Sequence, residues 1–218
     1  AMDNTCLDAG EIVDRVIESS SQIARVQLQK TQNLRRELMH TLIQDEHLIC
    51  SHFQGIFHLS QITREQIEDS KKQQSFAPLA DNLFGFEALI RVRTDLLKTH
   101  LDKDQIVVEP QYLRPDVLFS LAKSTKTSLE LDQACLRSAA EHSQGLPGAL
   151  MVNILPRNLY FIDRLREYFK DRGALILEVS ESEAISNFAL MNQVRHYLRE
   201  ESVGIAADDF GRGFAGLE

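Results

Sequence analysis

From residue 149 onward, the chain alternates short apolar runs with amphipathic segments. The apolar runs are GALMVNIL, GALILEVSE and VGIAADDFG, and two stretches with helical spacing separate them, one opened by Pro156 and one reading SNFALMNQVRHYLREE. A β-α-β-α-β order of this kind produces parallel strands, which need helices to cover the faces of their sheet. We therefore expect an α/β fold built on a parallel sheet.

The region before residue 149 continues this mixture of strands and helices. Strands are predicted at HFQGIFHL and LFGFEALIRV, and helices at RPDVLFSLAKS and SLELDQACLRSAAEHS. The stretch from Ser60 to Asn82 is polar and rich in Lys and Gln, which predicts a loop or a mobile insertion. The sequence does not indicate what this insertion does.

A long helix precedes these elements. Residues 11 to about 48 contain no Gly or Pro and space their apolar side chains by three and four. The positions that form this pattern are Ile12, Val16, Ile23, Val26, Leu34, Leu38 and Leu42. Two interpretations stay open: the helix packs on its own domain, or it is a signalling or dimerising helix that joins an upstream sensor domain. We accordingly divide the chain into a helical extension, residues 1–50, and a main domain, residues 51–218.

The composition argues against several classes of protein. A net charge of -8 does not suit a broad surface for a nucleic-acid polymer. No apolar run approaches the roughly 18 residues of a membrane span, and the first residues lack the features of a signal peptide. The three cysteines, Cys6, Cys50 and Cys135, form neither a disulfide framework nor a zinc pattern. A reducing cytoplasm is therefore the expected location.

Each strand predicted after residue 149 carries a polar side chain near its C-terminal end, namely Asn153, Glu178 and Asp208. In parallel α/β folds these strand ends converge on the active site. Their oxygen atoms are hard ligands, which suit Mg²⁺ or Mn²⁺ rather than zinc. The adjacent carboxylates of Asp208 and Asp209 repel each other unless water screens them or a cation holds them. Ordinary roles as turn residues, helix caps or solvated charges are the alternatives.

Four segments resemble, in order and spacing, the signature segments of the EAL domain: FGFEALIRV, MVNILP, LILEVSESEAI and IAADDFGRGFAGL. That family comprises bacterial phosphodiesterases that hydrolyse the second messenger cyclic di-GMP, and the resemblance runs from about His52 to the end of the chain. It implies a (β/α)8 TIM-type barrel. Because residues 51–218 are fewer than the roughly 250 of such a barrel, we expect an incomplete barrel of about five strands, truncated on its C-terminal side.

The resemblance also implies roles for individual residues. Five side chains match metal ligands of the family: Glu87, Asn153, Glu178, Asp208 and Asp209. Asp208 matches the ligand that bridges two ions, and Asp209 a ligand of the second ion. Glu181 matches an acid that orders a loop beside the metals. Arg91 matches a basic side chain that contacts a ligand phosphate, and Gln54 lies where the family places a residue near the bound nucleotide.

The activity implied by the resemblance is that of a cyclic-guanylate-specific phosphodiesterase. Two Mg²⁺ or Mn²⁺ ions activate a water that opens cyclic di-GMP to linear pGpG. The alternative is a catalytically inactive cyclic di-GMP receptor or a signalling and dimerisation module, and a homodimer and an upstream sensor domain remain open as partners. Three positions depart from the family's usual residues: Gly55 for Pro, Leu155 for Ser, and Arg212 for Thr or Ser. Arg212 either adds a phosphate contact or hinders entry to the site.

Overall fold

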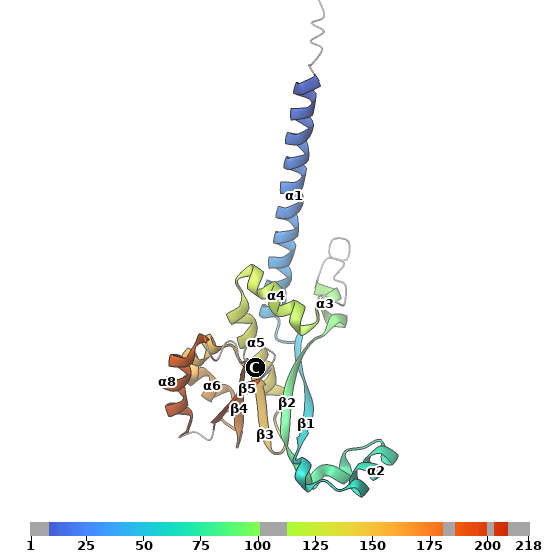
Figure 1. Ribbon diagram of the computed structural model, residues 1–218, viewed down its shortest axis with the longest axis vertical. Coiled ribbons are helices and arrows are strands. Elements are labelled where there is room, and N and C mark those ends of the chain that lie inside the picture. The colour runs from blue at the N-terminus through green and yellow to red at the C-terminus, as the bar shows by residue number, and fades with distance from the viewer. Residues whose placement is uncertain (1–8, 101–112, 181–185, 200–202, 209–218) are drawn as a thin grey trace, which may run out of the picture.

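The structure is a computed structural model, and it describes residues 9–100, 113–180, 186–199 and 203–208. Three residues singled out from the sequence, Asp209, Glu181 and Arg212, lie outside the described residues. Figure 1 shows an α/β body, from which a long helix extends in one direction and a short helical arm in the other. The body carries every described candidate site residue.

Five strands form one sheet in the order β1-β2-β3-β4-β5. Their bounds are β1 Ile49–Phe57, β2 Leu83–Val92, β3 Ala149–Asn153, β4 Leu175–Ser180 and β5 Val203–Asp208. Strands β2 to β5 are parallel, which confirms the expected α/β fold, and the sheet has the expected number of about five strands. Strand β1 runs antiparallel to β2 and begins three residues before the predicted HFQGIFHL run, at Ile49. The sequence pattern did not reveal this reversed first strand.

Several helices pack against one face of this sheet. The α-helices are α1 Ala9–Gln44, α2 Arg64–Gln73, α3 Thr94–His100, α4 Pro115–Thr125, α5 Ser128–His142, α6 Ile162–Tyr168 and α8 Phe188–Arg199. Short 3-10 helices are η1 Leu59–Gln61, η2 Ala77–Asn82 and η4 Pro156–Phe161. Pro156 does open a helix, as expected, but the first turn is a 3-10 helix that leads into α6. The predicted helices at α4, α5 and α8 are confirmed.

We call the face of the sheet that α5, α6 and α8 cover the outer face, and this face holds the main hydrophobic core. Leu150, Val152, Leu177 and Val179 are at most 2% exposed there. They form one cluster with apolar side chains of α5, α6 and α8, among them Leu136, Ala139, Leu165, Phe169, Leu190 and Leu198. Successive residues of a strand point to opposite faces, so this packing commits the alternate residues of the same strands to the other face.

The stretch from Ser60 to Asn82 is a helical arm, and the prediction of a loop was wrong. Its helix α2 begins with a capping box: the Thr63 side chain accepts a hydrogen bond from the Gln66 amide, and the Gln66 side chain accepts one from the Thr63 amide. The rings of Phe57 and Phe76 stack with centroids 5.9 Å apart where the arm leaves the sheet. The polar composition concealed the helix, whereas the TREQ signature of the cap indicates it.

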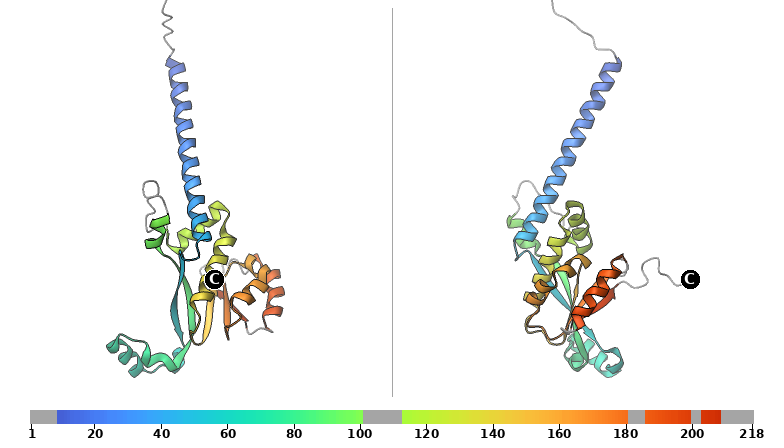
Figure 2. Two further views of the ribbon diagram at one scale, coloured as in Figure 1. Left: turned by 180° about the vertical axis from the view of Figure 1, so that it is seen from behind. Right: turned by 90° about the vertical axis from the view of Figure 1, so that its left-hand side faces the viewer.

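Helix α1 divides into a packed end and a solvated end. Near its C-terminus, Leu38 is 6% exposed and Leu42 1% exposed, within a second core shared with α4 and α5. Further up the helix, Ile23 and Val26 are 59% and 47% exposed, and the helix stands away from the body (Figure 2). None of the helices within the described residues is long and apolar enough to cross a membrane.

Candidate functional site

The register of the sheet brings the predicted site residues to one face. Gln54 pairs with Glu87 and Asn153 pairs with Glu178, and paired residues point to the same side of a sheet. Asn153 also lies two residues beyond the partner of Glu87, and Asp208 lies two residues beyond the partner of Glu178. We call this side the inner face, and six predicted residues lie on it: Gln54, Glu87, Arg91, Asn153, Glu178 and Asp208.

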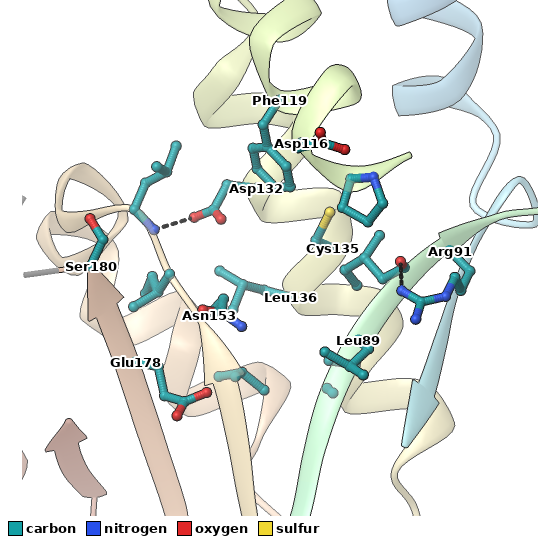
Figure 3. A pocket seen from close by; sticks show the side chains of 17 residues that line it. Leu89, Arg91, Asp116, Phe119, Asp132, Cys135, Leu136, Asn153, Glu178 and Ser180 are labelled. Carbon is teal, nitrogen blue, oxygen red and sulfur yellow. Dashed lines mark hydrogen bonds between the residues drawn. The ribbon is translucent and has the colours of Figure 1, made fainter. Parts of the chain in front are cut away.

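The oxygen donors on the inner face rise toward the C-terminal ends of the strands. Glu87 of β2 is the lowest, Asn153 and Glu178 share the next level, and Asp208 at the end of β5 is the highest. A stagger of this kind follows from the tilt of strands in a barrel. Figure 3 shows Asn153 and Glu178 near each other at the ends of β3 and β4.

A gap between β2 and β3 opens the site toward the helices. The two strands pair only between residues 85–88 and 149–152, although β2 continues to Val92. At the base of this pairing, a Cβ atom on Gly85 would overlap the carbonyl oxygen of Ala149, so glycine is what permits the close approach. Above it the strands separate, and a cavity of about 530 Å³ lies in the space between them.

The cavity joins three of the predicted residues to side chains of the helices. Arg91, Asn153 and Glu178 line it from the strands, and α4 and α5 contribute Phe119 and Asp132 (Figure 3). The other described candidates lie on the inner face but outside this lining: Gln54, Glu87 and Asp208. The structure thus places all six on one face and brings three of them into one cavity.

Glu178 is the least exposed of the described acids on the inner face. Its side chain is 9% exposed, and its Oε2 atom is buried without a hydrogen-bond partner in the described part of the chain. Burial, together with the smaller effect of the negative charges of Glu87 and Asp208, raises the pKa of this carboxyl to about 7. A buried carboxylate with an unpaired oxygen is costly unless a cation or a proton accompanies it.

The oxygen atoms on the inner face are of the kinds that bind a hard divalent cation. Carboxylates and an amide oxygen are what Mg²⁺ and Mn²⁺ prefer, and the unpartnered Oε2 of Glu178 is the atom that most needs a cation. Among the residues that the structure describes, however, no three His, Cys, Asp or Glu side chains stand close enough to hold one ion. One predicted ligand, Asp209, is not among those residues, and neither is Glu181, the acid predicted to order a loop beside the metals.

Arg91 reaches the cavity from the upper part of β2. Its Nη1 atom donates a hydrogen bond to the carbonyl oxygen of Ile90 at 2.8 Å (Figure 3). A guanidinium has five N–H donors, so this bond leaves the group able to serve an anion as well. The planar fork of arginine suits a phosphate.

Sequence reasoning missed the contribution of α5 to the site. Asp132 is 3% exposed and lines the cavity, although it lies in the helical stretch SLELDQACLRSAAEHS that we assigned only to the fold. The sequence does contain a signal for this residue. The helical period places Asp132 on the same side of α5 as Leu131, Cys135 and Leu136, which are also buried, and an acid on the buried side of a helix is unusual. Burial raises the pKa of the Cys135 thiol far above its usual range, so this wall residue remains uncharged.

Comparison with known proteins gives a consistent assignment of family. The family model described as "EAL domain" matches residues 61–218. The signaling protein YkoW of Bacillus subtilis (strain 168) is 26% identical over 172 residues, which cover 72% of this chain and 20% of that protein. The chain therefore spans about a fifth of the length of this curated relative.

A solved EAL domain shares the fold of this chain. The FimX EAL domain from Pseudomonas aeruginosa, crystallised with c-di-GMP, superposes with a TM-score of 0.55 at 13% identity, over 82% of this chain and 63% of that one. BlrP1 of Klebsiella pneumoniae, crystallised with manganese and cyclic di-GMP, matches 97% of this chain and 52% of that chain at 19% identity, with a TM-score of 0.47. The chain covers less than two thirds of either structure.

Proposed function

The chain belongs to the EAL domain family, and we propose that it hydrolyses cyclic di-GMP to linear pGpG with the help of divalent metal ions. This activity would place it in bacterial second-messenger signalling. The observation that carries the proposal is Glu178: a nearly buried carboxyl with an unpartnered oxygen, beside two further acids on the same face of the sheet. An arrangement of this kind is stabilised by a cation.

We assign the metal ligands to the ends of β2 to β5. The donors are Glu87, Asn153, Glu178 and Asp208, together with Asp209, which follows β5 in the sequence. Bound Mg²⁺ or Mn²⁺ ions would supply a water that is acidic enough to react at neutral pH and would neutralise charge on the phosphate. Glu181 would order the loop after β4.

The remaining residues would bind the dinucleotide. Arg91 reaches the cavity from β2 and would offset the charge of a phosphate, and Gln54 on the neighbouring strand would lie beside the nucleotide. The oxygen of the attacking water forms a new bond to phosphorus, the opposite P–O bond breaks, and the departing ribose oxygen takes up a proton. The product is the linear dinucleotide with one intact phosphodiester.

One observation favours a second candidate, a receptor that binds cyclic di-GMP without cleaving it. Within the described ranges the acids share a face but do not form a ready cluster of three around one point. A cavity of about 530 Å³ with an arginine and an amide in its wall is sufficient for binding part of a nucleotide whether or not metals assemble.

The two functions are separated by one experiment on the 218-residue chain. The chain is incubated with cyclic di-GMP and Mn²⁺ or Mg²⁺, the linear product is measured by chromatography, and EDTA serves as the metal-free reference. Binding of cyclic di-GMP and of Mn²⁺ is measured in parallel by calorimetry. We expect metal-dependent product, and we expect Glu178→Gln to lose at least about tenfold in metal affinity and the corresponding activity. Glu141→Gln, an exposed acid on α5, is the matched control and should retain both. Binding without product would support the receptor, and neither binding nor product would overturn both functions.

A further inference from the structure

The loop that follows Asn153 is held from the helix layer. One carboxylate oxygen of Asp132 on α5 accepts hydrogen bonds from the backbone N–H of Leu155, at 3.0 Å, and from the side-chain amide of Asn158. The amide oxygen of Asn158 accepts in turn from Nε2 of Gln133, at 3.0 Å. We call Asp132, Gln133 and Asn158 the loop clamp.

A second anchor ties the backbone just after Asn153 to β4. The backbone N–H of Ile154 donates to the carbonyl oxygen of Glu178 at 2.9 Å, which continues the ladder between β3 and β4 by one residue. The next amide, that of Leu155, already belongs to the loop clamp. The backbone just after Asn153 is therefore tied to β4 by one bond and to α5 by the next.

The burial of the clamp makes its geometry specific. Asp132 is 3% exposed and Asn158 is 1% exposed, so both side chains have exchanged water for these particular partners. A carboxylate in such surroundings is costly unless it is hydrogen-bonded, and a buried apolar side chain would have packed without that cost. Unlike an apolar side chain, the carboxylate forms directional hydrogen bonds, and these fix the position of two donors on the loop. It also lines the same cavity as Asn153 and Glu178 (Figure 3).

We propose that Asp132 is a positioning residue of the site: through the loop clamp it sets where Asn153 presents its amide oxygen beside Glu178. The inference rests on the proposed metal-dependent function for its consequence, but its geometric content concerns residues of this chain alone. A ligand displaced by about 1 Å loses much of its contribution to a metal or catalytic site. Asp132 thus acts on the site only through Asn153.

The competing explanation is that Asp132 only anchors the loop. In that case, removing the Asp132 carboxylate would lower the stability of the loop but would leave the Asn153 side chain in place. The test must therefore measure the position of the Asn153 side chain directly, in addition to folding and activity.

Exchanging the two polar partners gives a rescue experiment. In Asn158→Asp two carboxylates face each other, and their repulsion should open the clamp. In Asp132→Asn the shape is kept but the charge-assisted bonds are weakened. The double variant Asp132→Asn/Asn158→Asp places an amide donor opposite a carboxylate again and so removes the repulsion. Because the Leu155 N–H and the Asn158 amide reach the same oxygen in the wild type, the new Asn serves only one of these two partners at that position, and the rescue is partial. Glu130→Gln, an exposed acid on the same helix, is the matched control.

Three readouts are compared: hydrogen exchange at the Leu155 amide, the NMR signals of the Asn153 side-chain amide, and the dissociation constant for Mn²⁺. We expect Asn158→Asp to accelerate the exchange about tenfold or more, to shift the Asn153 signals away from their wild-type positions, and to weaken Mn²⁺ binding by roughly 10–100-fold. Asp132→Asn should show smaller changes in the same direction. The double variant should reverse a large part of the change that Asn158→Asp causes in all three readouts, and Glu130→Gln should leave them unchanged.

The proposal is overturned if Asn158→Asp and Asp132→Asn expose the Leu155 amide while the Asn153 signals keep their wild-type positions, or if the double variant is no better than Asn158→Asp. If Asn158→Asp does not fold, Asp132→Asn decides by the same comparison of Leu155 exchange with the Asn153 signals. If the wild-type chain binds no Mn²⁺, the proposed function fails, whereas Asn153 signals that follow the clamp still support the positioning role.

Discussion

The two faces of the sheet use neighbouring residues for opposite purposes. Leu177 on the outer face is 0% exposed and packs among the apolar side chains of the helices. Glu178, the next residue, points to the inner face, where it is 9% exposed and has an oxygen without a partner among the described residues. One position stabilises the fold by burial, and the other bears a buried charge that costs stability.

This contrast teaches where the chain keeps its chemistry. On the outer face the alternate residues of β3 and β4 are Leu or Val, and any similar apolar side chain would serve there. On the inner face the donors are individual and tied to the ends of particular strands. A site that is destabilising in the absence of its ligand is what a binding function requires, because the ligand then supplies the missing interaction.

The largest effect is expected on the outer face. Leu177→Ala should lower the free energy of unfolding by about 2–5 kcal/mol, since it removes fully buried apolar atoms and leaves a cavity. Ile176→Ala, the adjacent residue on the inner face, is only partly buried and should cost about 1 kcal/mol or less. Urea denaturation of both variants tests the comparison. Equal losses would mean that the inner face is packed as tightly as the outer face.

A smaller effect, with a pH signature, is expected at Glu178. The raised pKa of this carboxyl means that the folded state holds its proton up to about pH 7, while the unfolded state releases it near 4.5. The contribution of Glu178 to stability is therefore full below pH 4.5 and is lost as the pH rises toward 7. In metal-free buffer, Glu178→Gln should gain on the order of 1–2 kcal/mol over the wild type between these pH values, once screening by water is allowed for.

The measurement is the difference in unfolding free energy between Glu178→Gln and the wild type from pH 4 to pH 8, with Glu141→Gln as the exposed control. Saturating Mn²⁺ should reverse the order at pH 8, because an ion stabilises the carboxylate of the wild type. A difference that does not depend on pH would contradict the assigned environment of Glu178.

The smallest effect is expected on the solvated end of α1. Ile23→Ser combined with Val26→Ser should change the free energy of unfolding by no more than about 0.5 kcal/mol, because both side chains are about half exposed or more. Leu42→Ala, on the packed end of the same helix and 1% exposed, should cost about 2–5 kcal/mol. Thermal unfolding at two protein concentrations checks this. A large, concentration-dependent loss in the Ile23 and Val26 variant would favour the dimerising interpretation of the helix.

The sequence predicted those site residues that follow a local pattern, namely a polar side chain at the end of an apolar run. Asn153, Glu178 and Asp208 each end an apolar run, and the parallel order of these runs already implied that their ends meet at one rim. Asp132 follows no such rule. It lies on a helix, and only the packing of that helix against the end of β3 brings its carboxylate to the amide of Leu155.

The helical arm shows the same limit from another side. Its composition predicted a loop, yet Thr63 and Gln66 form a capping box that begins a helix between two strands. Composition averages over a window, whereas a cap depends on two side chains three residues apart. The assignment of a domain boundary at residue 50 remains a prediction, as do the roles of Asp209, Glu181 and Arg212.

By itself, the sequence determined the alternation of strands and helices, the parallel direction of β3 to β5 and the identity of the oxygen donors, because hydrophobic period and strand-end chemistry are properties of short segments. Only the tertiary structure decided the antiparallel placement of β1, the gap between β2 and β3 and the clamp from α5. Those features depend on which distant segments come into register, and register is set by the joint packing of a face rather than by any one segment.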